Sequence, residues 1–474
     1  MTEKIVLQTV TRIEGHGKVS IFLDGRGEVE RAHFHAVELR GFEKFCQGRM
    51  VWEMPLIMPR ICGICSTSHH LAAAKACDNL FGVHIPPTAV KLRTLMNLGQ
   101  IIHSQAEHFF FLASPDYFLG PDYSPTDRSL IGLMKAAPES AGKAIQLRKF
   151  GSTICDMVGG RTIHPVSAIP GGMSKPLTHE QRFTLLKDAE SVIDLALWAV
   201  KVAREIVERY ASEFAPAFGT FPTPFLALTQ HGQLEFYDGP MRIIGEDGQA
   251  LDEFAPRGYL QYLGEQVADH TWMKFPFYLR KGWPDGSYRV GALARLNVAQ
   301  GIDTPLADEE LREFKRLGNG HPVFENFYYH YARCIEMLHA VEKARALLLD
   351  DEIVGDEVRV KVERHAGEGV GVVEAARGTL IHHFRADETG KVEMANLVVA
   401  TVHNSAALDR TVAGAARHFV HGGKIEEGIL NRVEMAIRCF DPCISCATHA
   451  VGRMPLEITL IARDGEEIDT ISRG

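Results

Sequence analysis

Arg60-Ile-Cys-Gly-Ile-Cys-Ser-Thr-Ser-His69 lies near the start of the chain and Asp441-Pro-Cys-Ile-Ser-Cys-Ala-Thr-His449 lies near its end, and each contains a Cys-x-x-Cys pair. One pair places two sulfur atoms within reach of one metal ion, and two pairs supply four thiolates, a ligand set that suits soft transition metals. If one metal site uses both pairs, the fold must bring the two ends of the chain together.

Two other kinds of protein also use Cys-x-x-Cys pairs. In a zinc ribbon the two pairs usually lie about 15 to 20 residues apart, whereas here almost the whole chain separates them. A thioredoxin-like redox site needs one pair in a βαβ setting, but Cys62-Gly-Ile-Cys65 precedes His69-His70 at what reads as a helix start. Both interpretations stay open from the pairs alone, and both are less favoured than a shared metal site.

The composition indicates a globular protein with a large core. The chain has 474 residues, of which 46% are hydrophobic and 23% charged, and 51 basic against 60 acidic residues give a net charge of -9. No run of lysine or arginine favours nucleic acid or an anionic membrane. A protein partner or a small neutral substrate fits this composition better.

The cysteine count and the N-terminal sequence bear on the compartment. The first residues contain no apolar stretch of signal length, and no eighteen apolar residues run uninterrupted, so we expect no membrane span. Nine cysteines, an odd number, argue against a disulfide framework. We therefore expect a cytoplasmic protein with reduced, metal-binding thiolates.

Hydrophobic periodicity predicts an α-rich α+β fold, with a large helical core and small peripheral β-sheets. No internal repeat or low-complexity linker divides the chain. A hairpin is expected within residues 4–39, with its turn at Asp24-Gly25. Long helices are expected over 87–113, 178–214 and 326–349. Short strands are expected over 358–363 and 379–384, and a turn at Thr389-Gly390 follows the second strand.

Further segments carry a resemblance to a known family. Besides both cysteine motifs, they are Thr11-Arg-Ile-Glu-Gly-His16, Arg40-Gly-Phe-Glu43, Gly160-Arg-Thr-Ile-His-Pro165 and Ala376-Arg-Gly-Thr-Leu-Ile-His-His383. Over its whole length the chain resembles the large, catalytic subunit of nickel-iron hydrogenases, in which the N- and C-terminal motifs meet at the core. The quinone-site subunit of respiratory complex I resembles this family in fold but lacks the four cysteines.

The resemblance implies a nickel-iron centre that cleaves H2 heterolytically. Cys62 and Cys443 would be terminal nickel ligands, while Cys65 and Cys446 would bridge nickel to an iron that carries cyanide and carbon monoxide. Thiolates are soft, electron-rich donors that suit a redox nickel. The alternative assignment, structural zinc, would need no iron.

Residues around the metals also follow from the resemblance. Arg377 would project its guanidinium over the open coordination position, with Asp116 and Asp441 near it, although an ordinary charge cluster is the alternative. Relatives commonly have proline before this arginine. Ala376 stands there in this chain, and the loss of the proline ring would loosen the backbone that aims Arg377. Ala400-Thr401 replaces the Pro-Ser of many relatives, and the threonine hydroxyl can still donate to a cyanide nitrogen.

Two further residues are expected to act on the cysteines. Glu14 would take the proton of the Cys443 thiol and pass it outward, and its alternative role is a salt bridge with Arg12 or a neighbour. His69 would donate a hydrogen bond to a cysteine sulfur and so tune the metals. Without the motif, a satisfied core histidine would be the better interpretation of His69.

A second cation site is implied near the C-terminal motif. In relatives a carboxylate, a backbone carbonyl and a histidine hold a divalent cation, usually magnesium, with waters completing the shell. The matching residues here are Glu43, the carbonyl of Leu397, and His449. A mainly oxygen shell suits magnesium, and the single histidine would also tolerate iron or zinc.

The C-terminal residues are expected to be a removable tail. Residues 1–449 would form the hydrogenase domain, and 450–474, with strand-like Leu456–Ile461 and a turn at Asp464-Gly465, would be cut off by a dedicated maturation endopeptidase after nickel insertion. Nickel could therefore be absent from a chain that still carries its tail.

Electrons must leave the chain through partners. The five other cysteines lack ferredoxin spacing, so an iron-sulfur small subunit is implied. Val37–Glu43, Ser68–Leu71 and Cys446–His449 look most like the cytoplasmic bidirectional enzymes, which implies flavin- and NAD-binding diaphorase subunits, with or without electron bifurcation to ferredoxin. Alternative acceptor systems are ferredoxin with heterodisulfide, NADP or the deazaflavin coenzyme. The alternative to an enzyme is a non-catalytic, complex I-like scaffold subunit.

Overall fold

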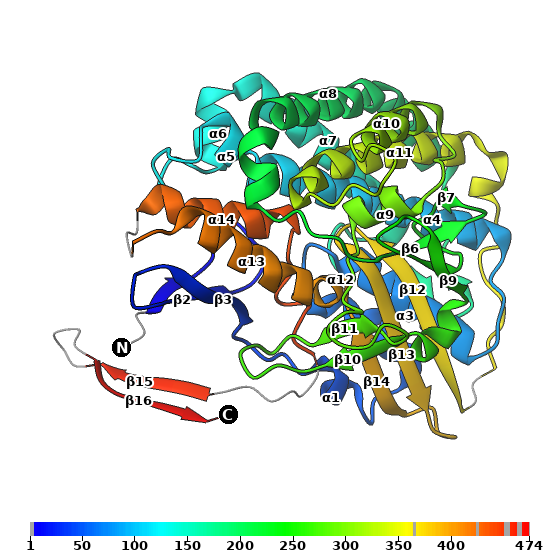
Figure 1. The fold of residues 1–474 in the computed structure, drawn as a ribbon. Coiled ribbons are helices and arrows are strands. Elements are labelled where there is room, and N and C mark those ends of the chain that lie inside the picture. Colours follow the sequence, from blue (N-terminus) through cyan, green and yellow to red (C-terminus); the bar gives the residue numbers. More distant parts are fainter. Residues whose placement is uncertain (1–3, 364–365, 423–425, 450–455, 462–466, 474) are drawn as a thin grey trace.

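Long helices form the core of the fold (Figure 1). The computed structural model describes residues 4–363, 366–422, 426–449, 456–461 and 467–473. The longer helices are α3 (Ser66–Leu80), α4 (Pro87–Ala106), α7 (Pro138–Gly159), α8 (His179–Ala217), α10 (Pro305–Arg316), α11 (Tyr329–Leu349), α13 (Ser405–Phe419) and α14 (Glu427–Cys439). The shorter ones are α1 (Phe42–Cys46), α2 (Met54–Ile57), α5 (Pro115–Phe118), α6 (Leu130–Ala136), α9 (Ala292–Val298) and α12 (Ala400–His403), with single turns between them.

The predicted long helices are confirmed, with small shifts at their ends. Helix α8 begins after Thr178, whose side chain accepts a hydrogen bond from the Gln181 backbone in a capping box. Helix α4 ends at Ala106, and the chain continues as a π-helical segment, η3 (Glu107–Ala113). A π-helical segment widens the helix and is frequent at functional sites.

Small antiparallel sheets accompany the helices, which confirms the α-rich fold class. The three-stranded sheets have the orders β1 (Lys4–Gln8), β2 (Gly17–Leu23), β3 (Val29–Ala36) and β12 (Gly367–Ala375), β13 (Gly378–Ala386), β14 (Val392–Val398). A four-stranded sheet has the order β7 (Gln233–Leu234), β6 (Phe225–Gln230), β8 (Met241–Ile244), β9 (Ala250–Phe254). The two-stranded pairs are β4 (Ala168–Ile169) with β5 (Gly172–Met173), β10 (Leu263–Gln266) with β11 (Phe275–Tyr278), and β15 (Leu456–Ile461) with β16 (Glu467–Arg473).

One strand prediction was wrong. Residues 358–363 alternate apolar and polar side chains, but they form an isolated bridge between Arg359 and Gly172 and no strand. The reason is that only a short stretch of chain lies beside them: Val360 donates to the Gly171 carbonyl, and Met173 donates to the Val358 carbonyl. The predicted strand over 379–384 lies within β13, and the turn before β14 closes through a hydrogen bond from Asp387 to the Lys391 carbonyl.

Helix α3 and strand β12 meet backbone to backbone, which fixes two parts of the site relative to each other. Gly369 and Gly371 share one face of β12, and a Cβ atom at Gly371 would lie 2.0 Å from the Ala72 carbonyl oxygen of α3. A Cβ atom at Gly369 would lie 2.2 Å from the Ala76 carbonyl oxygen. Only glycine permits this approach, so the sheet that leads to Arg377 is seated directly on the helix that follows Cys65.

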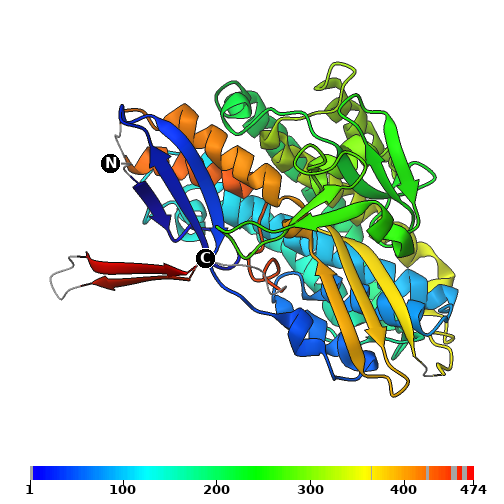
Figure 2. The ribbon, with the colours of Figure 1, turned by 60° about the horizontal axis from the view of Figure 1, so that its bottom comes forward.

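The C-terminal hairpin lies to one side of the other elements. Strands β15 and β16, drawn in red, stand apart from the body of the fold in both Figure 1 and Figure 2. The strand expected at Leu456–Ile461 is confirmed as β15, and the turn expected at Asp464-Gly465 lies outside the described residues. Among the described helices, none is long and apolar enough to cross a membrane.

Candidate metal centre

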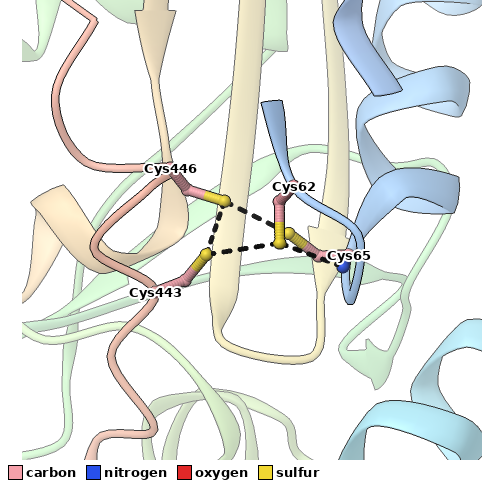
Figure 3. A group of neighbouring side chains, drawn as sticks. All are labelled: Cys62, Cys65, Cys443 and Cys446. Atoms are coloured by element: carbon pink, nitrogen blue, oxygen red, sulfur yellow. Dashed lines mark hydrogen bonds between the residues drawn. The ribbon is translucent and has the colours of Figure 1, made fainter. Parts of the chain in front are cut away.

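The four cysteines of the two terminal motifs meet at the core (Figure 3). Cys62 and Cys65 precede α3, and Cys443 and Cys446 lie in the loop after α14. The sulfur of Cys446 lies 3.2 Å from that of Cys65 and 2.6 Å from that of Cys443, which is 3.6 Å from the sulfur of Cys62. All four are buried. This is the convergence of the chain ends that the sequence predicts.

The environment of the sulfurs fits a shared cation. Burial raises the pKa of the Cys443 and Cys446 thiols, whereas hydrogen bonds from Cys443, Cys446 and Cys62 lower the pKa of Cys65. Four buried sulfurs this close cannot all be anionic without a positive charge between them, and a bound metal supplies it while it displaces the protons. The donor set therefore suits a soft metal centre.

Glu14 contacts the C-terminal pair directly. Its carboxylate accepts from the Cys443 thiol at 3.0 Å and from the Ser445 backbone N–H at 3.1 Å. The Ile444 backbone N–H also donates to the Glu14 carbonyl at 2.9 Å. The alternative salt bridge with Arg12 is not formed among the described residues, because Arg12 pairs with Asp116 instead.

Arg377 and Asp441 form a buried pair beside the sulfurs. The Arg377 guanidinium donates to the Asp441 carbonyl at 2.8 Å and to its carboxylate at 3.0 Å, and it lies 3.5 Å from the Ser104 hydroxyl. Burial lowers the pKa of Arg377, but Asp441 and the nearby cysteines outweigh that effect, so the pKa is raised well above its usual value. Burial raises the pKa of Asp441 to about 6.

Ala376 and Arg377 form the tight turn between β12 and β13, which carries the guanidinium to the site. The Ala376 carbonyl accepts from Arg295 at 3.1 Å and from Gln105 at 3.3 Å. Arg295 is itself held by buried ion pairs with Glu336 and Glu374. The hydrogen bonds to the Ala376 carbonyl hold the turn in place at the position where many relatives are expected to have proline.

Asp116, which was expected near Arg377, pairs with other residues. Its carboxylate accepts from Arg12, from Arg438 at 2.9 Å and from Asn431 at 3.2 Å. Within the described residues no ion pair joins Asp116 to Arg377. Among the described residues the acidic partner of Arg377 is therefore Asp441, and Asp116 belongs to a neighbouring cluster that ties the N-terminal loop to α14.

A small cavity lies against three of the cysteines and is lined by residues of several elements. Its walls combine apolar side chains with the polar groups of Arg377, His69 and Thr401; the other lining residues are Cys65, Ala375, Leu380, Val399, Ala400, Cys443 and Cys446. The Thr401 hydroxyl accepts from the Cys443 backbone N–H at 2.9 Å, so its own proton is free to donate. The His69 Nε2 atom lies 3.4 Å from the Cys446 sulfur.

Comparison with known proteins identifies the family. A family model described as nickel-dependent hydrogenase matches residues 40–119 and 227–449, and a model described as HoxL-like matches residues 4–39. The chain belongs to the nickel-dependent hydrogenase family. It is a hydrogenase large subunit, an oxidoreductase that acts on H2.

Similar proteins support this assignment over nearly the full length. A chain of the F420-non-reducing hydrogenase vhu of Methanocaldococcus jannaschii is 47% identical over 87% of this chain and 99% of its own length. The NAD-reducing hydrogenase HoxS subunit beta of Cupriavidus necator is 40% identical over 100% of both chains. The crystal structure of an NAD+-reducing [NiFe]-hydrogenase in the H2-reduced state superposes with a TM-score of 0.92, at 42% identity, over 94% of this chain and 100% of that chain.

Glu43, Leu397 and His449, the residues expected to hold a second cation, lie next to one another in the hydrogenase subunit. The Glu43 carboxylate accepts from the Leu397 backbone N–H at 2.9 Å, and the Glu43 N–H donates to the His449 carbonyl at 3.3 Å. Both ring nitrogens of His449 are buried without a hydrogen-bond partner, which is costly unless a ligand takes one of them. Burial lowers the pKa of His449 to about 3, so the imidazole is neutral, as metal binding requires.

One residue of the hydrogenase site was missed in the sequence. His382 lies 3.0 Å, nitrogen to nitrogen, from the Nδ1 atom of His69, and burial lowers its pKa well below the usual value. Alternation along β13 sends its neighbour His383 to Tyr259 instead. The sequence contained a signal for this residue: His382 and His383 are successive residues of a predicted strand, so one of the two faces the site and the other faces away.

Proposed function

We propose that this large subunit cleaves H2 reversibly as part of a multimer that passes electrons through an iron-sulfur small subunit to NAD+. The meeting of four buried cysteines with Glu14 and Arg377 carries the catalytic part of the proposal. The full-length similarity to NAD-reducing relatives supports the acceptor and implies diaphorase-type subunits. With such carriers the complex would be cytoplasmic.

In this proposal the cysteines hold a nickel-iron centre whose iron carries cyanide and carbon monoxide. Cys62 and Cys443 would bind nickel alone, and Cys65 and Cys446 would bind both metals. The centre would supply the Lewis acidity and redox capacity that split H2. The carboxylate of Glu14 takes the proton from the Cys443 sulfur, which it already contacts at 3.0 Å.

Arg377 provides fixed positive charge, and two groups orient the centre. Because Asp441 binds the guanidinium through two acceptors, the fork is held in one orientation beside the cavity. His69 donates to the Cys446 sulfur, and Thr401, with Ala400 beside it, offers its hydroxyl proton to an iron ligand. Glu43, the Leu397 carbonyl and His449 would hold magnesium or another divalent cation.

The C-terminal tail is proposed to be removed during maturation. Residues 450–474 follow the last predicted ligand, His449, and their hairpin stands apart from the body of the fold. Cleavage after His449 by a dedicated endopeptidase would remove the hairpin and leave the domain of residues 1–449. Nickel would be inserted before the cut.

The acceptor has several alternatives. Relatives named F420-non-reducing hydrogenases are 36% to 47% identical to this chain, a range that includes the 40% and 42% identity of the NAD-reducing relatives. The names of these relatives state that they do not reduce F420 and name no acceptor, so ferredoxin with heterodisulfide, NADP, the deazaflavin coenzyme and bifurcation between NAD+ and ferredoxin are alternatives with the same H2 chemistry. The choice lies with the partner subunits.

The acceptor is tested by purifying the native complex through an affinity tag on the small subunit. We expect a flavin- and NAD-binding module to copurify and H2 to reduce NAD+ without an added carrier. A complex that reduces an artificial viologen dye but not NAD+ would contradict NAD coupling while it supports H2 cleavage. Nickel near one equivalent per chain supports catalysis, and its absence after tail removal favours the complex I-like scaffold.

Arg377→Lys is expected to lower H2 uptake about 100-fold, the cost typical of losing one preorganised charge-stabilising donor. A lysine ammonium is a point charge that cannot reproduce the planar fork held by Asp441. Uptake and nickel content are measured on the same preparations, and nickel should be unchanged. Arg93→Lys is the matched control, because Arg93 is a buried arginine paired with Asp78 outside the site; equal losses in both variants would return Arg377 to a structural role.

A further inference from the structure

A second group of metal-ligand side chains lies outside the hydrogenase centre. The ring nitrogens of His33 and His270 and a carboxylate oxygen of Asp409 all lie within 4.8 Å of one another. The three residues come from strand β3, from the segment before β11, and from helix α13. Nothing in the H2 chemistry proposed above uses them.

The distances between the three side chains are those of a ligand set. His270 Nε2 lies 2.9 Å and His33 Nδ1 lies 3.6 Å from the same oxygen of Asp409. Ligand atoms bound about 2.0 to 2.1 Å from a tetrahedral zinc ion lie about 3.4 Å apart, which falls between these two distances. The imidazole rings of His33 and His270 lie with their centroids 4.3 Å apart.

The hydrogen bonds within the group leave one ligand atom unused. His33 Nδ1 is buried and has no hydrogen-bond partner. A buried imidazole nitrogen without a partner is costly. A histidine–carboxylate pair explains His270 and Asp409, but it does not explain why a second imidazole nitrogen points at the same oxygen.

Hydrogen bonds that involve the backbone hold Asp409 and the segment of His270 next to strand β3. The other carboxylate oxygen of Asp409 accepts from the Phe34 N–H at 2.8 Å, which fixes the carboxylate next to β3. His35 Nδ1 contacts the His270 carbonyl at 2.5 Å. Thr271 accepts from the Ala36 N–H at 2.9 Å. Such supporting bonds orient metal ligands and fix their geometry.

A cavity gives a metal ion access to the group. A pocket of about 860 Å³ is lined by His270 and Asp409, and Arg410 and Lys281 also line it. Three protein ligands leave a fourth tetrahedral position, and the pocket beside His270 and Asp409 gives room for a solvent ligand. Two imidazoles and one carboxylate suit zinc and other borderline divalent ions better than magnesium or calcium.

We propose that His33, His270 and Asp409 form a further metal site that binds zinc or a similar borderline divalent transition metal, with a solvent ligand on the pocket side. The bound ion would join the N-terminal sheet to α13 and to the segment before β11. The site uses nitrogen and oxygen ligands only, so its metal differs in spectroscopy from a metal held by the four cysteines.

The test compares zinc retained by the intact complex with that of two variants. The complex, with its nickel-iron centre loaded, is equilibrated with zinc, washed with a weak chelator and analysed for metals. We expect one zinc ion per chain in the wild type and at least a tenfold weaker affinity after His33→Phe, which keeps the ring contacts, or Asp409→Asn, which keeps the acceptor for Phe34. Zinc should also raise the melting temperature of the wild type alone.

His321→Gln is the control, because His321 is an exposed histidine outside the group. Cobalt provides a second probe: nitrogen and oxygen ligands give visible d–d bands without the sulfur-to-cobalt charge transfer that cysteines would produce. Equal zinc retention in the wild type and both variants overturns the proposal, as does a wild type that retains none. If the Asp409→Asn variant misfolds, zinc retention by the His33→Phe variant alone tests the proposal. Hydrogen uptake by each variant shows whether its complex is intact.

Discussion

Replacing Cys446 by serine is expected to abolish H2 uptake. Its sulfur lies 2.6 Å from that of Cys443 and 3.2 Å from that of Cys65, both shorter than an ordinary sulfur–sulfur packing contact, so it connects the two cysteine pairs. A serine hydroxyl is a hard and weakly acidic donor that does not replace a bridging thiolate. Nickel content and H2 uptake should both fall to background.

The same variant is expected to retain residues 450–474. If the endopeptidase acts only on a loaded centre, intact-mass measurement will find the unprocessed chain. Cys77→Ser is the matched control, since Cys77 is buried and donates to the Val51 carbonyl, a bond that a hydroxyl can keep. A Cys446→Ser chain that is trimmed and active would show that this sulfur does not bridge the metals.

Glu14→Gln is expected to lower turnover about 1000-fold, within the range for loss of a positioned general base. The glutamine oxygen can still accept from the Ser445 N–H, so the local fold is kept, but the amide cannot take a proton from Cys443. Nickel content should match the wild type. Exchange of H2 with deuterated water should slow by a similar factor, because protons then lack their first acceptor.

Glu38→Gln controls for the loss of a carboxylate in the same N-terminal segment. Glu38 is exposed and pairs with His16 at 2.7 Å, away from the sulfurs. Its amide variant should turn over at the wild-type rate. If Glu14→Gln also kept the wild-type rate, protons would have to leave by another group, and the contact with Cys443 would be structural.

The sequence predicted the centre better than its surroundings. Two Cys-x-x-Cys pairs can be recognised without a structure, because metal chemistry limits which residues can share one site. The pairing of Arg377 with Asp441 also followed from family motifs. The ion pairs of Asp116 could not be predicted, because its partners Arg12 and Arg438 come from opposite ends of the chain and no local pattern records such contacts.

The fold shows the same division between local and distant information. Long helices such as α8 carry their periodicity and caps in their own residues. Residues 358–363 have the alternation of a strand, but a strand also needs a long enough neighbour, which only the folded chain determines. His33, His270 and Asp409 follow no spacing rule, since three separate elements supply them.

The origin of Cys65 and Cys446 at opposite ends of the polypeptide has a consequence for biosynthesis. The ribosome makes one pair of ligands early and the other almost last, so a nascent chain cannot offer four sulfurs to a metal until nearly all of it has been translated. A truncated product has half of a ligand set, which binds a metal far less tightly. Tight metal binding by all four sulfurs would therefore distinguish full-length chains from truncated ones, because only a chain translated past Cys446 contains both pairs.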